Sequence, residues 1–118
     1  MRENVIKIKS FAFALRVVRL YQFLCNEKKE YILSKQLLRS GTSVGAMVRE
    51  AEHAETKADF KHKMGIAQKE INETIYWLEL LNETEYMTKD QFENINNEAI
   101  EIIKLITSII KTTKANNN

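Results

Sequence analysis

The scarcity of turn-forming residues constrains the fold of this chain more than any other feature of its sequence. The 118 residues include no proline and only three glycines. Tight turns and β-hairpins depend on these two residue types, so a fold built from many short strands is excluded. The sequence therefore predicts an all-α protein.

The size and the single cysteine narrow the class of protein further. A chain of this length corresponds to one domain, and it can bury enough surface to hold a core without disulfides or metals. Cys25 has no partner for an intramolecular disulfide, so we expect it to be a small buried side chain in a protein of the reducing cytoplasm. The first residues lack the apolar segment of a signal peptide, and no stretch approaches the roughly 18 apolar residues of a membrane span. We therefore expect no membrane partner.

Apolar residues recur at spacings of three and four, which predicts amphipathic helices. The expected elements are four helices, at about 5–26, 34–55, 57–84 and 89–113, and a frayed polar tail over 114–118. Short connections between helices of this length are typical of an up-down-up-down arrangement. The sequence thus predicts a single antiparallel four-helix bundle over 1–118.

Polar residues mark where three of these helices begin. Ser34 is a usable N-cap for the second helix. The segments from Thr56 to Asp59 and from Thr88 to Gln91 have the spacing of capping boxes for the third and fourth helices.

Each predicted helix has an apolar stripe that we assign to the core. In the first helix the stripe is Ile8, Phe11, Leu15, Val18, Gln22 and Cys25. In the second it is Leu37, Gly41, Val44, Val48 and Ala51. In the third it is Phe60, Met64, Ala67, Ile71, Leu78 and Leu81, with either Thr74 or Ile75. In the fourth it is Ile95, Ala99, Ile102, Ile106 and Ile109.

Two helices carry more apolar residues than a bundle needs, which is about three in seven. The surplus residues are Phe13, Val17 and Leu24 in the first helix and Ile100, Ile103 and Ile110 in the fourth. Large exposed apolar patches usually mark interfaces. We therefore predict a homo-oligomer.

The charges are distributed unevenly along the chain. Residues 1–49 carry ten Lys and Arg against three Glu, a net of +7, whereas residues 50–118 carry a net of −5. This asymmetry indicates either an anionic partner for the first half or subunits whose halves attract one another head to tail, a contact that can close into a ring. The alternative is that these charges only keep the outer faces of separate helices in water and bind no partner.

A basic patch in the first half is the candidate nucleic-acid-binding site. Its residues are Arg16, Arg19, Lys28, Lys29, Lys35 and Arg39. Such a patch would neutralise phosphates of RNA or DNA without reading their sequence. Tyr76 and Trp77 could stack on bases, but packing in the core or in an interface is the simpler reading. Dispersed surface charge remains the alternative for the whole patch.

The second helix contains small and polar residues that favour a structural role. Gly41 and Gly45 lower the helix profile and let a neighbouring helix approach closely, although each costs helix propensity. A direct ligand-binding role is the alternative. Glu50 and Glu70 are candidates to pair with Arg39 or Arg49, and Arg39 is preferred because its planar fork matches a carboxylate.

The two histidines raise the question of a metal. His53 follows Glu50 and His62 follows Asp59 at the spacing that ferritin-like bundles use to hold iron. Both pairs, however, fall near the predicted turn between the second and third helices, and the first helix offers no carboxylate between its ends. A di-metal centre, a surface metal site and ordinary exposed histidines remain open, with the last favoured. The chain contains neither a Walker loop nor the cysteines of a zinc deaminase, so we expect no cofactor and no enzymatic activity.

Several polar positions resemble a known family. They are Gln36, Arg39, Ser40, Ser43, Glu50, Asp59 and Phe60, and the segment 73–81 resembles the end of the family's third helix. This pattern resembles the bacterial four-helix bundle proteins encoded by intervening sequences in 23S rRNA genes, the S23-like family. The chain departs from it at Met47, where Asn is common, and at Ala51, where many members have Gly.

The resemblance implies a four-helix bundle, often assembled as a ring-like pentamer, with no established enzymatic activity. Related bundles are accessory proteins of diversity-generating retroelements, which implies nucleic acid and a protein partner. We therefore expect a non-enzymatic oligomeric assembly protein. The alternative is a nucleic-acid-binding accessory protein that uses the basic patch, and we expect the seven motif residues to be structural.

Overall fold

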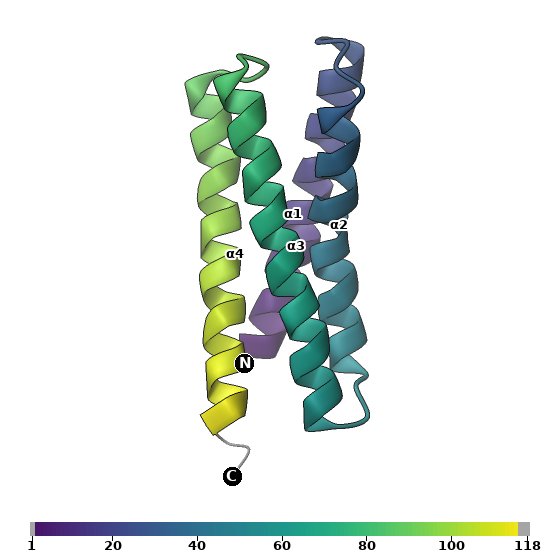
Figure 1. The fold of residues 1–118 in the computed structure, drawn as a ribbon, viewed down its shortest axis with the longest axis vertical. Helices are drawn as coiled ribbons and strands as arrows, with labels where there is room; N and C mark the ends of the chain where they lie inside the picture. Colours follow the sequence, from purple (N-terminus) through teal and green to yellow (C-terminus); the bar gives the residue numbers. More distant parts are fainter. Residues whose placement is uncertain (1, 116–118) are drawn as a thin grey trace.

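Four long antiparallel helices make up the part of the chain that the computed structural model describes, residues 2–115. The elements are α1 Arg2–Asn26, α2 Leu33–Glu52, α3 Lys57–Glu83 and α4 Lys89–Ala115. They run alternately up and down in a rod of about 50 × 21 × 19 Å (Figure 1). The predicted all-α four-helix bundle is confirmed. Among the helices of residues 2–115, none combines the length and the apolar character that a membrane span requires.

The helix bounds differ from the predicted ones at a few ends. α1 begins at Arg2, and α2 ends at Glu52, three residues before the predicted end. α4 continues through Lys114 and Ala115, which were expected to belong to the frayed tail. The rest of that predicted tail, 116–118, lies outside the described residues.

Two of the three predicted helix caps are present. The Thr56 hydroxyl accepts a hydrogen bond from the backbone N–H of Asp59, at 3.0 Å. Thr88 and Gln91 form both bonds of a capping box, at 2.9 and 3.1 Å. The third prediction is wrong, since α2 begins one residue before Ser34 and is capped by the carboxylate of Glu30.

The predicted core stripes of α2, α3 and α4 are largely confirmed. All five assigned residues of α2 and all five of α4 are buried. In α3 the buried position is Thr74, and Ile75 is only partly buried against the core. Phe60, expected in the core, also lies at its edge.

The predicted core stripe of α1 is wrong. Ile8, Phe11 and Leu15 are exposed. The face that enters the core instead is formed by Ile6, Phe13, Val17 and Leu24. Phe13, Val17 and Leu24, which the sequence analysis assigned to exposed apolar surface, are therefore core residues. The exposed apolar surface of α1 is formed instead by residues that the sequence analysis assigned to the core.

The small residues of α2 explain which face of α1 turns inward. A Cβ atom on Gly41 would lie 2.8 Å from each γ carbon of Val17, and one on Gly45 would lie 3.4 Å from the carbonyl oxygen of Ser10. Both contacts are on the Val17 side of α1. Because these glycines let the two helices approach closely on that side, the stripe with Ile8, Phe11 and Leu15 is left facing outward.

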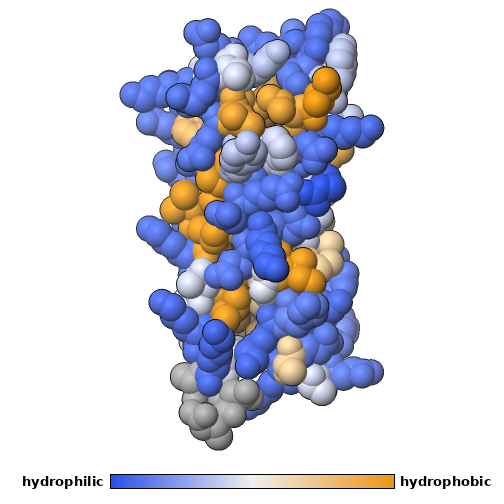
Figure 2. Space-filling view, viewed as in Figure 1, coloured by the Kyte–Doolittle hydropathy of each residue, from blue (hydrophilic) through white to orange (hydrophobic). Residues whose placement is uncertain are grey.

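The surplus predicted for α4 is not exposed. Ile100, Ile103 and Ile110 are partly buried, and no large apolar side chain of α4 is exposed among those described. The face in Figure 2, which has α3 at the front, is mostly hydrophilic with small separate apolar groups. The exposed apolar surface thus lies mainly on α1, which is at the back of Figure 1.

Candidate interaction surfaces

The outer face of α1 is an apolar stripe without a partner helix in the bundle. Its members are Val5 (40% exposed), Ile8 (69%), Phe11 (50%) and Leu15 (42%). The guanidinium carbon of Arg49 lies 5.2 Å from the centre of the Phe11 ring, so this cation borders the stripe on the α2 side. Apolar residues at helical spacing on a solvent-facing side are typical of an interface.

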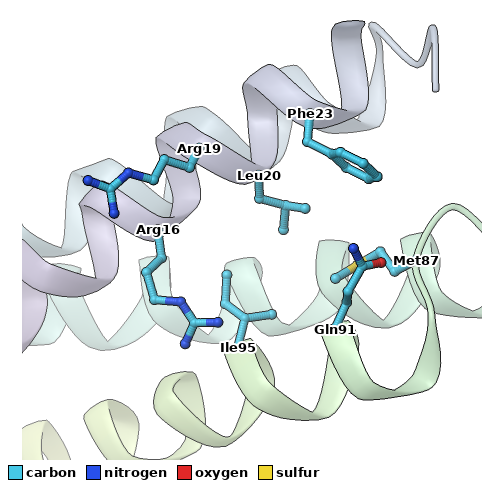
Figure 3. Close-up of a pocket in the computed structure, with 7 residues that line it drawn as sticks. All are labelled: Arg16, Arg19, Leu20, Phe23, Met87, Gln91 and Ile95. Carbon is cyan, nitrogen blue, oxygen red and sulfur yellow. The ribbon is translucent and has the colours of Figure 1, made fainter. Parts of the chain in front are cut away.

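A groove runs along the seam between α1 and α4. It has a volume of about 300 Å³ and is lined by Arg16, Arg19, Leu20, Phe23, Met87, Gln91 and Ile95 (Figure 3). Met87 and Ile95 are buried residues, so the floor of the groove reaches the core. Figure 3 shows the Arg16 side chain extending toward α4 and the Arg19 side chain pointing away from the cavity. The two cations do not converge on a common point that would hold an anion.

Two ion pairs bridge the same seam, one of them made by Arg16 of the groove. Arg16 Nη1 lies 2.8 Å from Glu98 Oε2, and Lys9 pairs with Glu101. Each of the four side chains is at least one-third exposed, so these pairs contribute little stability individually. The seam between α1 and α4 is therefore held by exposed charges above the apolar core.

The connector between α1 and α2 forms a surface that we call the basic knob, made of Lys28, Lys29, Tyr31, Ile32 and Lys35. Tyr31 is 57% exposed and Ile32 is 76% exposed. The three lysines are exposed, and none forms an ion pair among the described residues. The knob combines two apolar side chains with three cations at one end of the bundle.

Glu30 fixes the shape of this connector. Its carboxylate accepts hydrogen bonds from the backbone N–H groups of Ile32, Leu33 and Ser34, at 3.2, 3.0 and 2.7 Å. Burial alone would raise the pKa of Glu30, but these N–H groups together outweigh it and lower the pKa. The Ser34 hydroxyl donates back to the Glu30 carbonyl at 2.7 Å, so the connector is tied to the start of α2.

A second surface at the same end of the bundle is acidic. A shallow hollow of about 370 Å³ lies between α3 and α4 and is lined by Glu79, Asn82, Glu83 and Phe92; we call it the acidic hollow. Neither glutamate forms an ion pair among the residues described. Phe92 is partly buried against the core and supplies an apolar wall.

Polar residues join α2 to α3. Arg39 donates to both oxygens of Glu70, at 3.3 and 3.2 Å, and pairs with Glu73. The indole N–H of Trp77 donates to Glu73 at 2.9 Å, and this bond, followed by that from Arg39, lowers the pKa of the Glu73 carboxyl. Trp77 thus packs and hydrogen-bonds within its own bundle.

Two buried hydroxyls lie on the same seam, close to the core. The Thr74 hydroxyl lies 2.9 Å from that of Ser40 and 2.7 Å from the carbonyl oxygen of Glu70. Both residues are completely buried. These contacts give the buried hydroxyls of Thr74 and Ser40 hydrogen-bond partners. The sequence pattern had left open whether Thr74 or Ile75 is the buried residue of this turn.

The motif residues that carry the family resemblance are placed mainly along this seam. Ser43 donates to the carbonyl oxygen of Arg39, at 2.6 Å. Arg39 pairs with Glu70 as expected, whereas Glu50 pairs with Lys63, at 2.9 Å. The other motif residues lie at the starts of α2 and α3: Gln36 is exposed in the first turn of α2, and Asp59 and Phe60 lie in the first turn of α3.

The six residues of the predicted basic patch do not form one surface. Arg39 faces α3 and Arg16 faces α4, each in an ion pair, and Arg19 is exposed on α1. Only the three lysines of the basic knob, Lys28, Lys29 and Lys35, lie together on one short connector and the first turn of the helix that follows it.

The two histidines lie at the surface, and the cysteine lies partly within the bundle. His53 and His62 are both exposed, and His53 lies 3.8 Å from Glu52. Within residues 2–115, no three His, Cys, Asp or Glu side chains are placed to share a metal ion. The Cys25 sulfur is partly buried, 3.8 Å from the Ser34 hydroxyl.

Sequence reasoning missed the two exposed residues of the knob and the acidic hollow. Tyr31 and Ile32 follow four charged residues in the predicted turn, which was an available signal, because large apolar residues in a solvated turn are unusual. The hollow left no such signal, since Glu79, Glu83 and Phe92 meet only when α3 and α4 pack.

The fold and these surfaces define a four-helix bundle with an unpartnered apolar face. Residues 2–108 match the family model described as 23S rRNA-intervening sequence protein, and the chain belongs to this family. It is similar to a crystal structure of a protein with unknown function from the S23 ribosomal protein family of Bacteroides thetaiotaomicron VPI-5482. The two are 61% identical with a TM-score of 0.93, over 94% of this chain and 99% of the other. The comparison with curated proteins gave no match.

Proposed function

We propose that this protein is a non-enzymatic assembly protein that associates with copies of itself through the outer face of α1. The observation that carries the proposal is the apolar stripe of Val5, Ile8, Phe11 and Leu15, which lies opposite the core face of the same helix. A helix that is apolar on two sides is typical of a helix buried between two packing partners. The bundle supplies one partner, and a second copy supplies the other.

The energetics favour an interface that extends beyond this stripe. Burying the exposed parts of four such side chains would contribute about 3–6 kcal/mol. The loss of translational and rotational freedom on association costs roughly 4–15 kcal/mol. The outer face of α1 therefore needs additional contacts, and the opposite charges of the two halves of the chain are available for them.

The other features support an assembly role. The motif residues form structural contacts between helices, and the groove between α1 and α4 lacks convergent polar groups. The resemblance to pentameric family members supports a closed ring of copies. The free Cys25 fits a reducing compartment, and we propose a cytoplasmic location.

The proposal is tested by placing charge on the outer face of α1. Ile8→Lys combined with Leu15→Lys should shift the protein to a lower mass in sedimentation velocity at micromolar concentration, because lysine cannot be buried there without a partner. Both side chains are exposed, so the helical circular dichroism should be retained. Ala46→Lys, on an exposed side of α2, is the matched control and should assemble like the wild type. Unchanged assembly of the Ile8/Leu15 variant would refute the role of this face.

Nucleic-acid binding is the second candidate function, favoured by the three unpaired lysines of the basic knob. Repetition of the knob around an oligomer would multiply the number of phosphate contacts. Replacing Lys28, Lys29 and Lys35 with Gln should weaken binding of a labelled RNA or DNA in fluorescence anisotropy and reduce the salt dependence. Wild-type protein that fails to bind at low salt would exclude this candidate.

A further inference from the structure

We propose that the basic knob of one copy docks in the acidic hollow of the next copy, so that neighbouring bundles lie parallel around a ring. This inference rests on the proposed self-association and adds which two surfaces meet. The first is the Tyr31–Ile32 pair with its lysines, and the second is the hollow lined by Glu79, Asn82, Glu83 and Phe92.

The basic knob presents exposed apolar side chains on a connector of fixed conformation. Ile32 is the most exposed large apolar side chain among those described, and its neighbour Tyr31 is also more than half exposed. Three backbone hydrogen bonds to Glu30 hold the connector in one conformation, so little conformational entropy would be lost on docking. Lys29 adopts a φ of 56°, which turns the chain sharply at the end of α1.

The hollow offers the complementary chemistry. Phe92 supplies an apolar wall for Ile32 or Tyr31, while Glu79 and Glu83 supply carboxylates for the lysines. None of these charged groups has an ion pair within its own bundle among the described residues. Both surfaces therefore keep their charge available for a partner of opposite sign.

The positions of the two surfaces determine the geometry of the contact. Figure 1 shows the α1–α2 connector and the α3–α4 connector at the same end of the rod, on opposite sides. A contact between different patches of identical subunits is heterologous, and it closes into a ring when the rotation permits. Because knob and hollow are at the same level, copies related in this way point in the same direction. The outer face of α1, on the knob's side of the bundle, then extends the interface along the rod.

A charge-swap experiment tests the contact with little risk to the fold. Lys35→Glu places an acid in the first turn of α2, and Glu83→Lys places a base in the last turn of α3. Each reversal is favourable for its own helix dipole, so neither should destabilise the bundle. Each single variant should dissociate at about tenfold higher concentration than the wild type in sedimentation equilibrium, and the double variant should recover most of that loss.

Control variants make the same charge changes elsewhere. Lys104→Glu and Glu55→Lys alter exposed residues outside both surfaces, and each should assemble like the wild type. Ile32→Ser should also weaken assembly while leaving the thermal unfolding temperature of the monomer unchanged, because this side chain is mostly exposed.

The outcomes separate this inference from the proposed function. A wild-type protein that is monomeric at micromolar concentration overturns both. An oligomer whose single variants assemble normally, or whose double variant fails to recover, overturns the knob-and-hollow contact and leaves self-association through α1 intact. Recovery in the double variant supports the contact.

Discussion

Replacing Gly41 with alanine tests the close approach of α1 and α2 that turns the outer face of α1 toward solvent. The new Cβ atom would lie 2.8 Å from both γ carbons of Val17 and 3.2 Å from its Cβ atom. Val17 is fully buried and β-branched, so rotation about χ1 cannot remove the overlap. The helices must separate to accommodate the methyl group.

The sign of the effect follows from two opposing contributions. Alanine gains about 1 kcal/mol of helix propensity over glycine. Overpacking of a tight core contact costs about 1–3 kcal/mol. Gly41→Ala should therefore lower the free energy of unfolding by up to about 2 kcal/mol. Gly65→Ala should raise it by about 0.5–1 kcal/mol, since no atom lies within 4 Å of a Cβ there.

Urea unfolding followed by circular dichroism measures both variants at one protein concentration, since association would shift the midpoint. The double variant Gly41→Ala/Val17→Ala should be more stable than the sum of its single changes predicts, with a coupling of about 1 kcal/mol or more. Stabilisation of Gly41→Ala equal to that of Gly65→Ala, or additive single changes, would refute the close-approach argument.

Three further substitutions test the polar contacts of the bundle. Glu30→Gln should cost about 1 kcal/mol at pH 7, as loss of a helix cap does. Because the pKa of Glu30 is lowered in the folded protein, its contribution to stability is complete well above the ordinary pKa of a glutamate and is lost as the pH falls through the folded pKa. Acid titration of unfolding should therefore be less steep in the variant. Arg39→Met should cost about 1 kcal/mol or less in dilute buffer, and the difference from wild type should shrink in 1 M NaCl, where exposed ion pairs are screened. Thr74→Val should cost about 1–2 kcal/mol, because it removes the hydroxyl partner of buried Ser40. Wild-type melting curves for any of these variants would contradict the role given to that residue.

The core faces of α2, α3 and α4 were predictable because most apolar residues of each helix lie on one side of it. The stripe of α4, from Ile95 to Ile109, is buried as periodicity predicted. The helix α1 has apolar residues on two sides, and periodicity cannot say which of them faces the core. The choice depends on the contact of Val17 with Gly41, which is 24 positions away in the sequence. The prediction that α1 has exposed apolar surface is confirmed, but the residues assigned to that surface are buried and several of those assigned to the core are exposed.

The candidate surfaces were harder to predict than the fold. Ser34 matched the usual N-cap pattern, but the turn at Lys29 brings the Glu30 carboxylate over the first N–H groups of α2 instead. The same turn directs Tyr31 and Ile32 outward, which depends on the path of the backbone rather than on residue type. By contrast, the Arg39–Glu70 pair was predictable, because a guanidinium and a carboxylate on facing helices favour pairing.

The central claim, that the outer face of α1 joins copies of this protein, is tested most directly by the mass of the untagged wild-type protein in solution. Multi-angle light scattering at micromolar concentration should report a multiple of 13.8 kDa. The Ile8→Lys/Leu15→Lys variant, measured beside it, should report a smaller mass with the same helix content. A wild-type mass of a single 13.8 kDa chain across the micromolar range would contradict the account.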